Sequence, residues 1–144
     1  MLEIKVLQAG KDWQEPLAQF MEELGLFMPE IVISQSGKPD FAKTYHFSVS
    51  HSGGYLALMV SDKPCGIDIE LAKHRNWEAL AKRFIKETSI SSEAEFYRAW
   101  VSKEAYGKMT GRGVLFSVSG RAEVVKSYED KGLYMAFATG EEDD

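Results

Sequence analysis

The chain has 144 residues, of which 44% are hydrophobic and 27% are charged, a composition typical of one compact domain with an apolar core. Its net charge of −5 argues against general nucleic-acid binding, and its apolar runs are too short to span a membrane. The N-terminus lacks the basic and apolar segments of a secretory signal, so we expect a cytoplasmic protein. The single cysteine, Cys65, excludes an intramolecular disulfide and a multi-cysteine metal site, and we expect it to be buried.

The first half of the chain predicts several strands and one amphipathic helix. The helix is expected over residues 12–25, with Asp12 as its N-cap and Gly25 as its stop. Strands are expected at 2–7, 31–34, 45–49, 55–60 and 65–71. Turns are expected at 36–39 and at 50–54, and the second of these carries a serine–histidine–serine run.

The second half predicts two helices followed by short strands. The helices are expected at 76–86 and from Ser91 or Ser92 to about 109, with Glu95 placed as in a capping box. Strands are expected at 116–118, 122–125 and 133–138. This is an α+β pattern, in which mainly strands are followed, after residues 65–72, by helices and then short strands. The change predicts a shortened N-terminal subdomain at 1–65 and a C-terminal subdomain at 66–140. The four acids at 141–144 are expected to form a solvated tail.

The strand GIDIE, residues 66–70, carries two acids between two isoleucines. Because side chains alternate along a strand, Asp68 and Glu70 share one face and the isoleucines share the other. Two such carboxylates can hold a hard divalent cation, whereas a solvent-facing strand edge is the simpler alternative. Arg75, in the polar link that follows, is expected to be solvated.

The third predicted helix, which ends at about residue 109, places Trp100, Glu104 and Lys108 on one face, because they are spaced by four residues. A surface salt bridge of about 0.3–0.5 kcal/mol is the simple interpretation of the last two. The many aromatic residues around them argue against a fully solvated face.

Two polar turns could contact a ligand. His51, flanked by Ser50 and Ser52 and followed by two glycines, suits phosphate oxygens, although a histidine satisfied within a turn is the alternative. The turn at 36–39 adds one basic residue, Lys38, and by itself indicates only a turn.

The order and spacing of these motifs resemble the 4′-phosphopantetheinyl transferase superfamily. The motifs are GKP at 37–39, FSVSHSG at 47–53, GIDIE at 66–70, AKRF at 81–84, WVSKEA at 100–105 with Lys108, and GRG at 111–113. The pattern is most similar to the larger class, which primes peptide and polyketide synthetases. That resemblance implies a pseudo-dimeric fold of two small α+β subdomains, each with an antiparallel sheet packed on a helix.

The resemblance also implies a reaction and its participants. The enzyme would move 4′-phosphopantetheine from coenzyme A to a serine of an acyl or peptidyl carrier protein, with Mg²⁺ as cofactor and 3′,5′-ADP as product. Nucleic acid and membrane are not expected as partners.

By the same resemblance, site residues can be assigned position by position. Asp68, Glu70 and Glu104 match the magnesium-binding acids. The residues that match coenzyme A contacts are Lys38, Pro39, Ser50, His51, Ser52, Lys103 and Lys108. Glu104 and Lys108 match catalytic residues, with Glu104 activating the acceptor serine.

Two other functions fit part of the pattern. A non-catalytic module that binds coenzyme A or a carrier protein would explain the short N-terminal half, in which 49 residues precede Ser50. A metal-dependent phosphohydrolase would use the same acids and lysines with water in place of the carrier serine.

Overall fold

The structure, a computed structural model, describes residues 1–73, 75–86, 89–111 and 122–140. Its elements in chain order are β1 (Leu2–Gln8), α1 (Gln14–Glu23), β2 (Ile31–Ile33), β3 (Pro39–Phe41), β4 (His46–Ser52), β5 (Tyr55–Ser61), β6 (Cys65–Leu71), α2 (Trp77–Phe84), α3 (Glu93–Thr110), β7 (Ala122–Asp130) and β8 (Leu133–Gly140). Within the described residues the strands form antiparallel sheets in the orders β1-β5-β4, β2-β3 and β6-β8-β7. The α+β class predicted from the sequence is confirmed.

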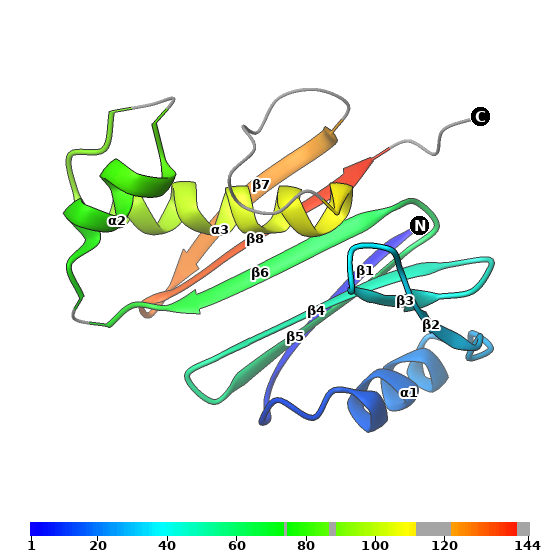
Figure 1. Cartoon of the computed structure of the whole chain (residues 1–144). Helices are drawn as coiled ribbons and strands as arrows, with labels where there is room; N and C mark the ends of the chain where they lie inside the picture. Colours follow the sequence, from blue (N-terminus) through cyan, green and yellow to red (C-terminus); the bar gives the residue numbers. More distant parts are fainter. Residues whose placement is uncertain (74, 87–88, 112–121, 141–144) are drawn as a thin grey trace.

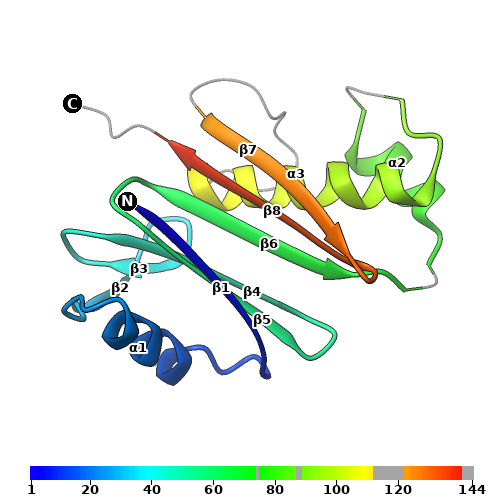
Figure 2. The ribbon, with the colours of Figure 1, turned by 180° about the vertical axis from the view of Figure 1, so that it is seen from behind.

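The two three-stranded sheets lie against each other, with α1 outside the first and α3 outside the second (Figures 1 and 2). The alternation of β5 produces this layering, because Leu56 and Leu58 pack under α1 whereas Ala57 and Met59 pack against Ile67 of β6. A third apolar cluster joins α2 and α3 to β8. As expected, Cys65 is buried. Of the helices in the described residues, none is both long and apolar enough to cross a membrane.

The helix ends agree with the sequence at most positions. Ser92 caps α3 by accepting a hydrogen bond from the Glu95 backbone N–H at 3.1 Å, as predicted. Gly25, with φ of 71°, follows the last residues of α1 and allows the chain to turn away. The prediction for Asp12 is wrong, because α1 begins after Trp13 and has no side-chain cap.

Two strand boundaries also differ from the prediction. A turn was expected at 36–39 and no strand directly after it, but residues 39–41 form β3 and pair with β2. Strand β4 continues through Ser52, so the turn to β5 is only Gly53-Gly54, whose φ angles of 57° and 83° suit a two-residue hairpin. The serine–histidine–serine run is therefore part of a strand. The predicted strand at 116–118 and the predicted tail at 141–144 lie outside the described residues.

Gly66, the first residue of the GIDIE motif, is where α3 comes closest to β6. A Cβ atom at this position would meet the carbonyl oxygen of Ala105 and would lie 2.7 Å from the backbone nitrogen of Met109. Only a residue without a side chain permits this approach. Because residues 66, 68 and 70 share one face of the strand, the same contact turns Asp68 and Glu70 toward α3.

Candidate active site

Asp68 is a buried acid that two hydrogen-bond donors hold. It is 7% exposed, and its Oδ1 accepts hydrogen bonds from the Ser50 hydroxyl at 3.1 Å and from Lys108 Nζ at 3.4 Å. Among the described residues, its Oδ2 is buried with no hydrogen-bond partner. Burial raises the pKa of Asp68 to about 7, and the charges of Glu104 and Glu70 act in the same direction against Lys108 and Ser50.

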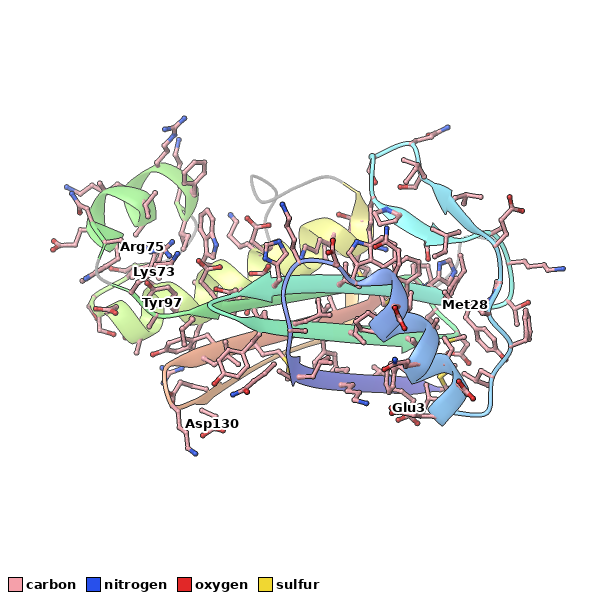
Figure 3. All side chains as sticks on the ribbon, turned by 90° about the horizontal axis from the view of Figure 1, so that it is seen from below. Glu3, Met28, Lys73, Arg75, Tyr97 and Asp130 are labelled. Atoms are coloured by element: carbon pink, nitrogen blue, oxygen red, sulfur yellow. The ribbon has the colours of Figure 1, made fainter. Side chains whose placement is uncertain are left out.

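Glu70 lies two residues further along β6, and it already has a cationic partner. Arg75 Nη2 lies 3.0 Å from Glu70 Oε1, and the guanidinium carbon is 5.5 Å from the centre of the Tyr97 ring on α3. The Tyr97 hydroxyl donates to the Lys73 carbonyl at 3.0 Å and accepts from the Lys73 N–H at 3.1 Å. Figure 3 shows Lys73, Arg75 and Tyr97 gathered at this end of the molecule. The expectation that Arg75 is solvated is wrong, because an ion pair and an aromatic ring hold it.

Glu104 of α3 is the third predicted acid and is only partly exposed. Burial raises the pKa of Glu104, and the charge of Glu70 raises it further while Lys108 opposes both. The three acids therefore act on one another electrostatically. Within the described residues, however, no three His, Cys, Asp or Glu side chains are grouped closely enough to form a ready metal cluster.

Lys108, one turn after Glu104 on α3, connects the two sheets. Its Nζ donates to the carbonyl oxygens of Val49 in β4 at 3.1 Å and of Ile67 in β6 at 2.9 Å, and it also reaches Asp68. Three acceptors match the three hydrogens of an ammonium group. The cation is therefore held at the junction of β4, β6 and α3.

The residues of the SHS run point to different environments. Ser50 and Ser52 accept hydrogen bonds from the backbone N–H groups of Ile69 and Leu71 in β6, at 3.0 and 2.9 Å. His51, on the opposite face of β4, is exposed. The structure thus brings both serines to β6 and leaves the histidine facing away from them.

Lys38 and Pro39 line a hollow beside the end of α3. One part of about 330 Å³ is lined by Gly37, Lys38, Pro39 and Lys108, and an adjoining part of about 510 Å³ again includes Lys38 and Lys108. Lys38 Nζ donates to the Phe47 carbonyl at 2.6 Å, which fixes the turn against β4. The two predicted ligand-binding lysines 38 and 108 therefore face the same space.

Asp40, in β3 directly after this turn, connects β3 to β4 through its carboxylate. Its Oδ1 accepts from the backbone N–H groups of Phe41 and Phe47, and its Oδ2 lies 2.9 Å from His46 Nδ1. Burial alone would raise the pKa of Asp40, but the hydrogen bond from His46 and the charge of Lys38 lower it overall. Sequence reasoning did not identify either residue, since neither belongs to a motif with a recognisable spacing.

Lys103 is placed differently from the other predicted lysines. It is 2% exposed on the buried side of α3 and does not line the hollow around Lys38. Trp100, one turn before Glu104, stacks on Phe96 with ring centres 5.8 Å apart. The helix face that carries the predicted site is therefore partly packed in the core.

Comparison with known proteins gives consistent similarities. Residues 64–132 match the family model of the 4′-phosphopantetheinyl transferase superfamily. The chain is 34% identical over 111 residues to 4′-phosphopantetheinyl transferase psf-1 of Bacillus pumilus, which covers 68% of this chain and 47% of that protein. It is 38% identical over 97 residues to 4′-phosphopantetheinyl transferase AcpT of Salmonella typhi, covering 58% of this chain and 50% of that protein. With 4′-phosphopantetheinyl transferase Sfp of Bacillus subtilis it shares 36% identity over 78 residues, or 48% of this chain and 34% of that protein. The chain thus matches about half, or less, of the length of these relatives.

Proposed function

This chain belongs to the 4′-phosphopantetheinyl transferase superfamily, and on that premise we propose that it moves 4′-phosphopantetheine from coenzyme A to a serine of an acyl or peptidyl carrier protein. The observation that carries the proposal is the environment of the two Asp68 carboxylate oxygens. Two donors hold one of its oxygens, and the other oxygen is buried without a partner among the described residues. Such an atom suits a divalent cation, because an isolated buried acceptor is otherwise unfavourable.

We propose Asp68, Glu70 and Glu104 as the ligands of Mg²⁺. The chemistry of the donors suits the ion, since Mg²⁺ prefers carboxylate oxygens and the acids raise the negative potential around one another, although the three side chains are not grouped as a metal cluster in the described residues. When bound, the ion would supply positive charge against the phosphate oxygens of the substrate.

The coenzyme is proposed to bind along the hollow beside α3. Lys38, Pro39 and Lys108 line this space, so two positive charges face it, although both ammonium groups also donate to protein oxygens. Ser50, His51, Ser52 and Lys103 remain the other contacts predicted by resemblance. The buried position of Lys103 and the existing hydrogen bonds of Ser50 make these two the least accessible of the set.

In the proposed reaction, the carrier serine oxygen attacks the phosphorus on the pantetheine side of the pyrophosphate. A new oxygen–phosphorus bond forms, the bond to the bridging oxygen breaks, and 3′,5′-ADP leaves with that oxygen. Glu104 takes the proton of the serine hydroxyl, a role that suits a carboxylate whose pKa is raised. The positive charge of Lys108 offsets charge on the departing group. Catalysis would then consist mainly of positioning and electrostatics.

We further propose residues 1–65 and 66–140 as the two subdomains, because the strands of the two larger sheets are separated at residues 62–64. The cytoplasm, where coenzyme A and carrier proteins are used, is the proposed compartment.

The test is incubation of the chain with coenzyme A, Mg²⁺ and a panel of apo-carrier proteins, followed by mass spectrometry of the carriers. A mass gain of one phosphopantetheine group on a carrier, lost in a Glu104→Gln variant, is the expected result. Folded protein that modifies none of the carriers would refute the proposal.

One alternative has a specific observation in its favour, namely that the chain matches about half the length of its relatives. A module that only binds coenzyme A or a carrier would give heat of binding in calorimetry without a mass gain. Release of 3′,5′-ADP from coenzyme A in the absence of any carrier would instead indicate a phosphohydrolase.

A further inference from the structure

Strand β4 uses serine hydroxyls to bind the backbone of β6. Ser48, Ser50 and Ser52 accept hydrogen bonds from the N–H groups of residues 67, 69 and 71, at 3.0, 3.0 and 2.9 Å. Strands β4 and β6 are the end strands of two different sheets, so their backbones do not form a ladder with each other. The three hydroxyls satisfy donors at the β6 edge that would otherwise be buried without partners.

The three serines differ in what else they contact. Among the described residues, the Ser48 and Ser52 hydroxyls accept hydrogen bonds from β6 backbone N–H groups, whereas the Ser50 hydroxyl also donates to Asp68 Oδ1. A hydroxyl has one proton, so this bond determines its direction and commits it to the carboxylate. Ser48 is 1% exposed and Ser50 is 7% exposed, so both hydroxyls are buried, where hydrogen bonds are stronger than in water.

The bond from Ser50 acts on one particular oxygen of the acid. Lys108 Nζ approaches the same oxygen, Oδ1, at 3.4 Å, and both donors therefore lie on one side of the carboxylate. Rotation of the carboxyl group would break both contacts. The Oδ2 atom, buried without a partner among the described residues, is consequently held in one place on a side chain that projects from the face of β6 that α3 covers.

We propose that Ser50 is a positioning residue for Asp68: its hydroxyl holds Oδ1 so that Oδ2 is the oxygen presented to the divalent cation. In this arrangement the Ser50 hydroxyl donates its proton to Asp68, and not to a phosphate of coenzyme A, which is the contact that the resemblance predicts. The inference rests on the proposed function for the nature of the cation, but its geometry uses only residues of β4, β6 and α3. Partners of this kind commonly change metal affinity by about 10–100-fold.

Ser48→Ala is a matched control for Ser50→Ala. Each variant removes one buried hydroxyl and one 3.0 Å bond to a β6 backbone nitrogen, but only Ser50→Ala removes the bond to Asp68. The probe is Mn²⁺, an oxygen-preferring ion whose free form is quantified by electron paramagnetic resonance. Thermal unfolding of both variants, and of Ser52→Ala, reports the cost of losing one backbone contact.

We expect Ser48→Ala and Ser52→Ala to lose similar thermal stability, and Ser50→Ala to lose at least as much, because it also loses the bond to Asp68. Mn²⁺ affinity should fall about tenfold in Ser50→Ala and change less than twofold in Ser48→Ala. Unchanged Mn²⁺ affinity in Ser50→Ala would overturn the proposal, as would an equal loss in Ser48→Ala, which would indicate that only the sheet contact matters. Absence of Mn²⁺ binding by the unsubstituted protein would also overturn it.

These measurements separate the two proposals. If the unsubstituted protein binds Mn²⁺ and the serine variants differ as expected, but no carrier gains mass, then the transferase proposal fails and the role of Ser50 stands. If carriers are modified while the serine variants bind Mn²⁺ equally well, the reverse holds.

Discussion

Replacing Asp68 with asparagine should stabilise the metal-free protein, and the gain should grow as the pH rises. Asparagine resembles the protonated acid, because its side-chain oxygen can still accept from Ser50 and Lys108. The ionised acid, in contrast, leaves a charged oxygen buried without a partner among the described residues. Asp68→Asn therefore removes the charge and keeps the contacts of Oδ1.

The magnitude follows from the two pKa values. Burial, reinforced by Glu104 and Glu70, raises the pKa of Asp68 from 3.8 to about 7. The stability that the protonated acid contributes is fully present below pH 3.8 and is lost as the pH rises through about 7. The complete loss corresponds to about 4 kcal/mol, of which about 2.5 kcal/mol falls between pH 5 and pH 8.

The assay is urea unfolding followed by tryptophan fluorescence, in buffers with a chelator, at pH 5, 6, 7 and 8. Asp130→Asn, an exposed aspartate at the end of β7, controls for the chemical change itself. Adding Mg²⁺ should then stabilise the unsubstituted protein more than Asp68→Asn. An asparagine variant whose advantage stays constant from pH 5 to pH 8 would refute this reasoning.

Four further predictions concern the surroundings of Asp68. Gly66→Ala should lower the free energy of unfolding by about 1–3 kcal/mol, because the new methyl group meets the backbone of α3; a urea midpoint equal to that of the unsubstituted protein would contradict the close approach. Lys108→Met should lower the free energy of unfolding by about 2–3 kcal/mol at pH 8, since three acceptors lose a charged donor. Lys82→Met, on the exposed side of α2, should change it little, and equal losses in the two variants would argue against the contacts of Lys108 with both sheets. Arg75→Gln should lower the free energy of unfolding by at most about 1 kcal/mol, because the ion pair with Glu70 is partly exposed. The variant should bind Mn²⁺ more tightly, because the Glu70 carboxylate is freed; weaker Mn²⁺ binding would show that Arg75 instead orients this carboxylate. Glu104→Gln should reduce transfer to the carrier by about 10²–10⁴-fold with the unfolding curve retained, and activity within tenfold of normal would remove Glu104 from the role of base.

Several features of this protein were predictable because their signals are local. Ser92 followed by Glu95 marks the start of α3, and a glycine with positive φ ends each of the clear helical patterns at 25 and 111. The alternation of Ile67 and Ile69 with Asp68 indicates one apolar and one acidic face, and the isoleucines are indeed buried between the sheets. The α+β class follows from the same short-range patterns.

The sequence predictions failed where a polar group binds a partner from a distant segment of the chain. Ser50 and Ser52 were predicted to lie in a turn, but they belong to β4, which pairs with β5. Their hydroxyls accept hydrogen bonds from backbone N–H groups of β6, 19 residues away. Arg75 reads as solvated, but the ring of Tyr97 and the carboxylate of Glu70 hold it. Polarity in the sequence does not distinguish a solvated group from one with a buried partner.

The sequence by itself determined most of the helices and strands, the class of fold and the identity of the acids and lysines that resemble a phosphopantetheinyl transferase site. The tertiary structure decided which atoms of those residues meet. Lys108 reaches Val49 across 59 residues of chain, and Ser50 holds one oxygen of Asp68 while the other stays buried without a partner in the described part of the chain. Helix caps and strand alternation depend on neighbours within a few residues, whereas these contacts depend on how two sheets and a helix pack, which no short segment specifies.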